Sequence, residues 1–421
     1  MNGTASLETK TTKAAWLALV LLVVSVAINY IDRTNLSVAA PGLRTELRLS
    51  PAQLGLLLSA FFWTYASFQI VSGWLVDRYA VNWVFGAGFL IWSLATAATG
   101  FVGGFGALFS LRLVLGAAES VAYPAYSKII ATRFPEHRRG LTNALIDAGS
   151  KIGPALGTLI GGLVIARFGW RSLFLILGFG ALLWVPLWAA WAPRAQAADT
   201  PLRHPGPGFV RILRERSAWG TFFGLFSINY AFYFLITWLP TYLVMERHFS
   251  IPMMAIVGSV PLWGLAASAT FNGWLSDRLI MRGATPTRVR KSFAATGLLL
   301  CTLVLPAVVV NSPWMCIALL TAACLLFGLC TANHWAITQT IAGSSAAGKW
   351  TGLQNAFGNL AGVAAPWATG VIVAATGHFF YAFLAVAVVL VLGALSFLFV
   401  VGPVAPIDWI NAELRGRPRL D

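Results

Sequence analysis

The stretch Gly73-Trp74-Leu75-Val76-Asp77-Arg78 returns almost unchanged as Gly273-Trp274-Leu275-Ser276-Asp277-Arg278. Each copy follows a long apolar run, and in both cases that run is the second in its half of the chain. A second matching pair, Gly140-Leu141-Thr142-Asn143-Ala144 and Gly352-Leu353-Gln354-Asn355-Ala356, opens the fifth apolar run of each half. Two echoes at corresponding places make chance a poor explanation. The sequence therefore predicts a chain built from two similar halves.

The apolar runs determine the fold class. Of the 421 residues, 58% are apolar and only 10% are charged, whereas a soluble protein is about one quarter charged. Runs near the ~20 residues that a helix needs to cross a bilayer recur along the whole chain. The sequence predicts an all-α membrane protein with twelve transmembrane helices, at residues 14–40, 52–74, 81–101, 105–131, 141–166, 172–192, 217–244, 253–275, 292–311, 314–341, 350–375 and 379–401.

The longest gap between apolar runs separates the two halves. It contains several prolines and arginines and is typical of a flexible basic linker. We therefore expect a six-helix half at residues 1–192, a linker at 193–216, a second six-helix half at 217–401 and a tail at 402–421. The tail and linker are both predicted to be cytoplasmic.

The distribution of basic residues predicts the orientation. The net charge is +15, but the basic residues lie mainly in short loops between runs, with no basic face on a soluble domain. Nucleic acid is therefore excluded as a partner. With the N-terminus inside, the outside loops contain few basic residues: Arg44, Arg48, Arg167, Arg171 and Arg247. The excess of positive charge on the other side predicts that both termini are cytoplasmic.

Enzyme motifs are missing from the sequence. The cysteines lie in or beside apolar runs and form no CxxC pair, so we expect small core residues rather than metal ligands or disulfides. They are Cys301, Cys316, Cys324 and Cys330. Residues 343–350 imitate a nucleotide-binding P-loop, but Trp350 replaces the magnesium-binding Ser or Thr and no strand precedes it. The chain is predicted not to be an enzyme and to use neither a cofactor nor a metal.

Charged residues inside the predicted spans mark a candidate site. Asn29-Tyr30-Ile31-Asp32-Arg33-Thr34-Asn35 places an acid and a base in the first span, where one charge costs about 3 kcal/mol near the bilayer centre. Arg112 and Glu119 are two turns apart in the fourth span and share a face. Helix rise predicts that Arg33 and Arg112 lie at similar depth. Asp32 and Glu119 can neutralise the two arginines when no substrate is bound, and a substrate carboxylate can do so during transport. The alternative is a closed ion-pair network that only joins helices.

With its twelve spans and repeated G-x-x-x-D-R motifs, the chain resembles the major facilitator superfamily. The stretches around Asp32-Arg33, Phe61-Phe62-Trp63-Thr64-Tyr65 and Trp238-Leu239-Pro240-Thr241-Tyr242-Leu243 are similar to its anion:cation symporter family. That family includes bacterial permeases for sugar acids and organic acids. The resemblance covers the whole chain and implies two six-helix halves around a central cavity.

The resemblance also implies roles for particular residues. Arg33 and Arg112 match positions tied to the substrate carboxylate, and Asp32 and Glu119 match positions tied to coupled protons. Four residues match positions that line the substrate cavity, although packing aromatics are an equal alternative for each alone: Tyr30, Tyr65, Trp335 and Asn355. The loop motifs match a cytoplasmic latch that acts in gating: Asp77, Arg78, Asp277 and Arg278.

Two further patterns give structural expectations. Asp147 and Lys151 stand at i,i+4 in the fifth span and should neutralise each other. Gly149, Gly153, Gly157 and Gly161 form a smooth ridge along the same span. Small residues at this spacing let another helix approach closely. From the resemblance, we expect the ridge to slide against the eighth span.

These observations predict a proton-coupled importer of a small organic anion in a bacterial inner membrane. Its expected partners are the anion, protons and the lipid bilayer, and it is expected to be a monomer. Transport would proceed by a rocker-switch movement of the two halves. An exporter or exchanger would use the same residues, and a membrane sensor that does not transport is an alternative of another class.

Overall fold

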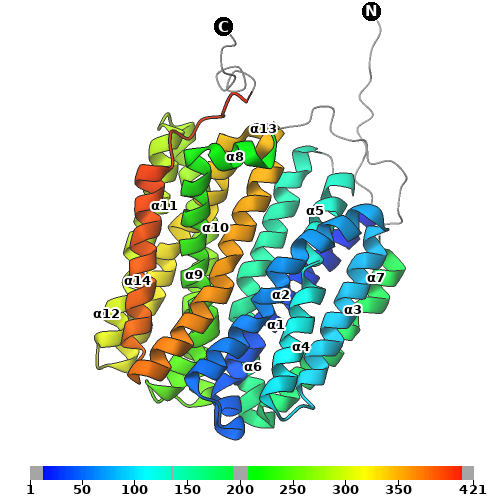
Figure 1. Cartoon of the computed structure of the whole chain (residues 1–421), viewed down its shortest axis with the longest axis vertical. Coiled ribbons are helices and arrows are strands. Elements are labelled where there is room, and N and C mark those ends of the chain that lie inside the picture. Colours follow the sequence, from blue (N-terminus) through cyan, green and yellow to red (C-terminus); the bar gives the residue numbers. More distant parts are fainter. Residues whose placement is uncertain (1–12, 134–135, 193–206, 410–421) are drawn as a thin grey trace, which may run out of the picture. The chain divides into compact units, whose positions relative to one another are not determined.

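A computed structural model describes residues 13–133, 136–192 and 207–409, which form helices joined by short turns (Figure 1). Among these residues there is no strand, in agreement with the predicted all-α fold. The chain is apolar almost throughout, so its backbone groups must bond within each segment when it enters a bilayer, and a helix achieves this.

The first half of the chain contains seven helical segments: α1 (Lys13–Leu47), α2 (Pro51–Arg78), α3 (Val81–Thr99), α4 (Phe105–Glu119), α5 (Ala122–Arg133), α6 (Glu136–Leu182) and α7 (Trp184–Trp191). The second half contains α8 (Phe209–Arg214), α9 (Arg216–Met245), α10 (Ile251–Met281), α11 (Pro286–Cys301), α12 (Val304–Val309), α13 (Pro313–Thr376) and α14 (Phe380–Leu395), followed by the π-helical turn Ser396–Val400.

The chain divides into two compact units. Unit 1 consists of Met1–Ser50, Ala60–Thr200 and Phe249–Ser259, and unit 2 consists of Pro51–Ser59, Pro201–His248 and Val260–Asp421. The first turns of α2 therefore belong to unit 2, and the first turns of α10 belong to unit 1. The predicted linker lies partly outside the described residues, and its described end forms the short helix α8.

Eleven helical stretches of the described residues are long and apolar enough to cross a membrane. Twelve spans were expected, and the difference comes from α6 and α7, because the single stretch Leu145–Trp191 covers most of both the fifth and the sixth predicted spans. The two are separated at Gly169, whose φ of 79° is not helical. Gly343, with φ of 64°, separates the tenth and eleventh spans within α13. Glycine tolerates this backbone region because it has no Cβ.

Local features confirm the internal repeat. Arg48 and His248 each follow the first long helix of their half and are the two described non-glycine residues with positive φ, at 51° and 59°. An acidic residue lies two positions before each of them and contacts a later segment of the same half. Glu46 accepts hydrogen bonds from Trp170 and Arg171, and Glu246 accepts one from the backbone N–H of Phe379. The turn after the first long helix is therefore formed in a similar way in both halves.

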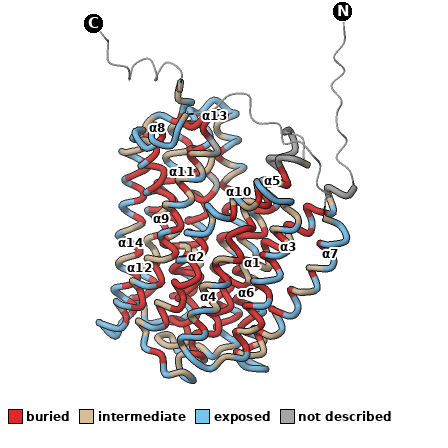
Figure 2. The backbone as a smooth tube through the Cα atoms, turned by 45° about the vertical axis from the view of Figure 1, so that its right-hand side comes forward, coloured by how far each residue is buried: buried red, intermediate tan, exposed pale blue. Residues whose placement is uncertain are grey.

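Burial follows the faces of the helices (Figure 2). Buried residues line the sides that turn toward neighbouring helices, whereas large apolar side chains remain exposed elsewhere, among them Ile70, Trp83 and Phe399. Apolar exposure on this scale would be unfavourable in water and suits the hydrocarbon of a bilayer. The four cysteines are buried and free, as expected for core residues.

The glycine ridge of the fifth span does not contact the eighth span as expected. A Cβ added at Gly149 would meet Val26, one at Gly153 would meet Tyr30, and one at Gly157 would meet Thr34. All three partners lie on α1. The ridge therefore holds α6 close against α1, the helix that carries Asp32 and Arg33. The glycine that approaches α10 is its neighbour Gly162, which faces Ala255.

Candidate functional site

Four ionisable residues of unit 1 are buried together between its helices. Asp32 and Arg33 come from α1, and Arg112 and Glu119 come from α4. Their exposed fractions are 2%, 3%, 4% and 0%. Charges removed from water this completely need partners, because an isolated buried charge is highly unfavourable. Neighbouring side chains or a bound ligand must therefore supply a partner for each of the four charges.

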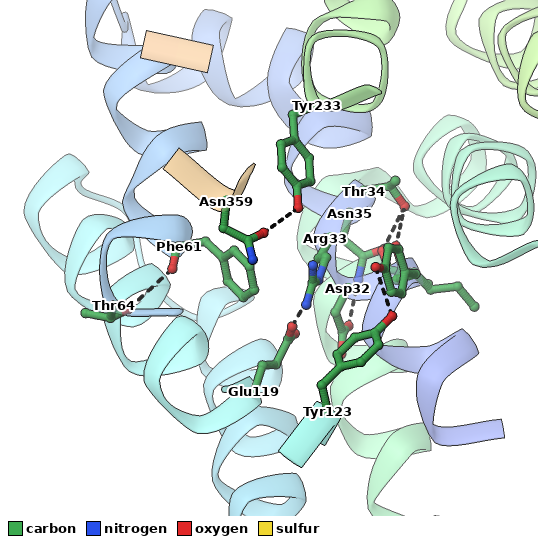
Figure 3. Close-up of polar contacts among 12 residues, drawn as sticks. Asp32, Arg33, Thr34, Asn35, Phe61, Thr64, Glu119, Tyr123, Tyr233 and Asn359 are labelled. Atoms are coloured by element: carbon green, nitrogen blue, oxygen red, sulfur yellow. Dashed lines mark hydrogen bonds and ion pairs between the residues drawn. The ribbon is translucent and has the colours of Figure 1, made fainter. Parts of the chain in front are cut away.

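Arg33 is held on several sides (Figure 3). Its Nε donates to Glu119 Oε2 at 3.3 Å, an ion pair between α1 and α4. Its guanidinium carbon lies 4.6 Å from the ring centre of Tyr30, 4.4 Å from that of Tyr65 and 5.0 Å from that of Phe61. Aromatic faces attract a cation at such distances. Arg33 is thus fixed in place by one carboxylate and three rings.

Arg112 has a different environment. Its guanidinium lies 5.1 Å from the Phe61 ring, but no Asp or Glu of the described chain comes within salt-bridge distance. Its Nε is buried without a hydrogen-bond partner there. Arg presents several N–H donors in a fork that matches a carboxylate, so the Arg112 guanidinium has the chemistry that anion binding requires.

The polar surroundings of these charges are not saturated. Asp32 Oδ1 accepts a hydrogen bond from Asn35 at 2.9 Å. Several buried polar atoms nearby have no hydrogen-bond partner among the described residues: both side-chain atoms of Asn29, Oδ2 of Asp32, Oδ1 of Asn35, Oγ1 of Thr96 and Oε1 of Glu119. Buried polar groups are almost always satisfied in proteins. The spare capacity fits a site that takes up a polar guest.

Asn29 and Thr96 were not among the predicted site residues. Asn29 faces the Glu119 carboxyl, and Thr96 of α3 faces the Asp32 carboxyl. Asn29 could have been recognised from sequence, since it lies one turn before Arg33 on the same helix. Thr96 gave no signal, because threonines are common in membrane helices and often bond only to their own backbone.

Tyrosine hydroxyls form a second polar group in unit 1. The hydroxyls of Tyr30 and Tyr123 lie 3.1 Å apart and link α1 to α5. One turn further along α5, the Tyr126 hydroxyl lies 2.9 Å from Ser25 Oγ and is buried. Tyr30 and Tyr65 were predicted from the family resemblance, and the structure places both rings on Arg33. Tyr123 was missed, although it stands four residues after Glu119.

The predicted site residues of unit 2 belong to α13. Trp335 is half-buried and packs on His334, with ring centres 4.6 Å apart. Asn355 is half-buried, and its neighbour Gln354 is buried and accepts a hydrogen bond from Thr338 at 2.6 Å. One turn further along, Asn359 accepts a hydrogen bond from Tyr233 of α9 at 2.9 Å (Figure 3). The polar face of α13 therefore extends beyond Trp335 and Asn355.

The repeated motifs were expected in loops, but the structure places them at the ends of helices, the first in the last turn of α2 and the second near the end of α10. Their contacts differ. Asp277 forms an ion pair with Arg290 of α11 at 2.5 Å, and Arg290 also donates to Asn333 of α13 at 3.0 Å. Arg278 lies on Trp274, with its guanidinium carbon 5.1 Å from the ring centre. Arg78 lies on Trp74 in the same manner, at 5.7 Å. The Asp77 side chain lies outside the part of the chain that the structure describes.

Asp147 and Lys151 form the predicted ion pair, with Lys151 Nζ 3.6 Å from Asp147 Oδ1. Because Asp147 is largely exposed, the pair contributes little to stability. Within the described residues, no group of three His, Cys, Asp or Glu side chains could hold a metal ion.

Comparison with known proteins places this geometry in a family context. The family model described as Major Facilitator Superfamily matches residues 22–366. The chain is 31% identical to a probable galactarate/D-glucarate transporter of Escherichia coli (strain K12), over 97% of each chain. It is 27% identical to a D-galactonate transporter of Escherichia coli O6:H1, over 92% of this chain and 96% of the relative.

A solved structure supports the same fold. The chain resembles the crystal structure of a bacterial homolog to the human lysosomal transporter Spinster in an inward-facing and occupied conformation, with a TM-score of 0.81. The similarity covers 93% of this chain and 97% of that chain, at 18% sequence identity. At this identity the likeness concerns the fold alone.

Proposed function

Because the chain belongs to the major facilitator superfamily, whose members are transporters and not enzymes, we propose that it imports a small organic anion together with protons. The observation that carries the proposal is the buried guanidinium of Arg112, which lacks a bound carboxylate among the described residues. A substrate carboxylate would supply the missing partner and recover a bidentate hydrogen-bonded pair.

The substrate class that fits best is a sugar acid or a related carboxylate. Relatives that align over nearly the whole chain are named for galactarate, D-glucarate and D-galactonate. Polyhydroxylated acids need hydrogen-bond partners for their hydroxyls as well as a cation for their carboxylate. The unsatisfied polar atoms around Asn29 and Thr96 and the tyrosines beside Arg33 offer such partners in unit 1. Trp335 and Asn355 are proposed to contribute from unit 2.

Proton coupling is proposed at Glu119 and Asp32. Glu119 pairs with Arg33 in the structure, and a substrate carboxylate would compete for that arginine. A buried carboxyl that loses its cation is more favourable as the neutral acid, so anion binding would promote proton binding. Release of the anion would return Arg33 to Glu119 and expel the proton. Such linkage is reciprocal and couples two ligands at one site.

Alternating access is proposed to follow from a rocker-switch movement of the two halves. Asp77, Arg78, Asp277 and Arg278 would act as cytoplasmic latches. The ion pair between Asp277 and Arg290 supports this role for the second motif, because it ties the end of α10 to α11. We also propose that the protein lies in a bacterial inner membrane with both termini in the cytoplasm and acts as a monomer.

Ligand binding to purified full-length protein tests the proposal. A ligand that binds the folded state raises the melting temperature, so a panel of galactarate, D-glucarate, D-galactonate and sulfate should show stabilisation by at least one of the acids. Arg112→Lys should abolish that shift, because an ammonium cannot reproduce a bidentate grip. Arg171→Lys, at an exposed pair with Glu46, serves as the matched control and should keep it.

The proposal fails if no carboxylate of the panel stabilises the wild-type protein. It also fails in its central assignment if Arg112→Lys responds to the acid as the wild type does. Uptake of the stabilising acid into proteoliposomes, driven by an inwardly directed proton gradient, then tests coupling and direction separately from binding.

A further inference from the structure

The hydroxyl groups of Tyr30 and Tyr123 bond to each other and keep hydrogen-bonding capacity that a purely structural contact does not need. We propose that Tyr123, acting with Tyr30, is a specificity-determining residue that selects hydroxylated acids over unsubstituted acids of the same length. The inference rests on the proposed function, since it concerns the same substrate site. It assigns to α5 a part in recognition that neither the repeat nor the buried charges indicate.

The hydrogen-bond capacity of the pair carries the argument. A tyrosine hydroxyl has one O–H donor and can also accept. The bond between Tyr30 and Tyr123 uses one of the two donors. Neither hydroxyl has a further hydrogen-bond partner among the residues that the structure describes. One donor and several lone pairs remain, which matches an alcohol group, itself both donor and acceptor.

The pair is also held at a fixed place relative to the cationic site. The Tyr30 ring lies on the Arg33 guanidinium, with the guanidinium carbon 4.6 Å from the ring centre, so this contact keeps the Tyr30 ring close to the cation. Tyr123 approaches from α5 and meets that hydroxyl (Figure 3). A ligand whose carboxylate lies at the arginines would therefore meet the hydroxyl pair a few atoms along its chain.

Exposure distinguishes this pair from the neighbouring one. The Tyr30 and Tyr123 side chains are both only partly buried, so a ligand can reach them. Tyr126, one turn along α5, is 2% exposed and its hydroxyl is bonded to Ser25. Tyr126 is therefore an example in α5 of a tyrosine with a structural role, since it is buried and its hydroxyl is bonded within the protein. It also provides a matched control of the same residue type.

A purely structural role for the Tyr30–Tyr123 bond makes a different forecast. If the bond only joins α1 to α5, removing it should weaken the binding of all acids alike, together with the stability of the protein. If the two tyrosines bind substrate hydroxyls, removing the bond should weaken the binding of hydroxylated acids alone. The ratio of two affinities therefore separates the roles, because a site built to bond a hydroxyl discriminates against analogues that lack it.

The experiment measures dissociation constants on the purified full-length chain for a hydroxylated acid and its unsubstituted counterpart. Galactarate and D-glucarate are paired with adipate, and D-galactonate with hexanoate. Tyr123→Phe should weaken binding of the hydroxylated acid about tenfold, the size expected for one hydrogen bond, and change binding of its counterpart less than twofold. Tyr126→Phe should leave the ratio of the two constants unchanged.

Tyr30→Phe removes the other hydroxyl of the pair and should cause the same loss of selectivity. It therefore provides a second test if Tyr123→Phe folds poorly. Tyr30→Phe combined with Tyr123→Phe should lose little more than either alone, because residues that act as a unit are not additive. The inference is overturned if the wild type binds a hydroxylated acid and both single variants keep its selectivity. If the wild type binds no hydroxylated acid, the proposed sugar-acid substrate falls and the inference with it.

Discussion

The two buried arginines have unequal surroundings, although they belong to one cluster. Arg33 is held by Glu119 and by the rings of Tyr30, Tyr65 and Phe61. Arg112 contacts only the Phe61 ring among these groups. A guanidinium that already has a carboxylate gains less from a substrate than one without. We therefore expect Arg112 to make the first contact with the anion and Arg33 to join when Glu119 is protonated.

Glu119→Gln should separate binding from coupling. Glutamine has a similar size and imitates the protonated acid, so substrate binding should survive. Exchange of labelled for unlabelled substrate across proteoliposomes should also survive, since it needs no net proton movement. Uphill uptake driven by a pH gradient should be lost. The measurement is the ratio of gradient-driven uptake to exchange in the same preparation.

Asp32→Asn is the companion variant, because Asp32 is the second proposed proton site. It should follow the pattern of Glu119→Gln if it carries a proton of its own. Accumulation by Glu119→Gln with the ordinary dependence on the gradient would show that the coupled proton binds elsewhere.

At the scale of a helix, the close approach of α6 to α1 determines where the charged residues lie. A Cβ at Gly153 would come 2.6 Å from Tyr30 Cβ and 2.9 Å from the Ala27 carbonyl oxygen. Gly153→Ala should therefore force the helices apart and destabilise the protein by about 1–3 kcal/mol, the usual cost of overpacking. It should also impair transport, because Tyr30 lies on Arg33.

Gly161→Ala is the matched control on the same ridge. A Cβ there would lie 3.6 Å from Leu173, which is an ordinary contact. Alanine is also the better helix former, so this variant should be as stable as the wild type or slightly more so. Melting temperatures of the two variants check the difference. Equal values would mean that the ridge does not determine the spacing of α1 and α6.

The last described residues, near Trp409, contact α13 of unit 2 at its Gly343 bend. Trp409 Nε1 donates to the Ala342 carbonyl at 2.8 Å, and Ile407 N donates to the Ile341 carbonyl at 3.0 Å. Carbonyl groups at the end of a helical segment generally lack partners within the helix, and these two hydrogen bonds supply them. The described first part of the predicted tail thus caps the tenth predicted span.

Trp409→Ala should lower the melting temperature and increase hydrogen exchange in residues 341–350, because it removes both the donor and the ring that packs on Trp350. Trp409→Phe keeps a ring and loses only the N–H group, so its effect should be smaller. Unchanged exchange in Trp409→Ala would show that the bend is stable without this contact.

At the scale of the whole molecule, the distribution of charge makes a prediction about topology. A reporter that is active only outside the cytoplasm should stay silent when fused after Asp421. The same reporter should be active when fused to a chain truncated after Arg247, which lies in a predicted outside loop. Activity of the first fusion would contradict two six-helix halves with both termini inside.

The sequence alone determined that this is a helical membrane protein with an internal repeat. Both follow from properties that act locally: apolar runs of bilayer length, and matching motifs in each half. It also marked Asp32, Arg33, Arg112 and Glu119 as charged residues inside predicted spans that need partners. A charge inside an apolar run is recognisable whatever it contacts. The mutual neutralisation of Asp147 and Lys151 was predictable because both lie on one helix, one turn apart.

Only the tertiary structure decided which partners these residues have. It assigned Glu119 to Arg33 and gave Arg112 no carboxylate partner within the described parts of the chain, a difference that depends on how α1 and α4 pack. It turned the glycine ridge toward α1, whereas the spacing of the glycines fixes a smooth face but not its partner. It brought Tyr123, Asn29 and Thr96 to the charges, and these neutral residues resemble many others in the chain. Contacts between helices depend on long-range packing, and no periodicity within one helix records them.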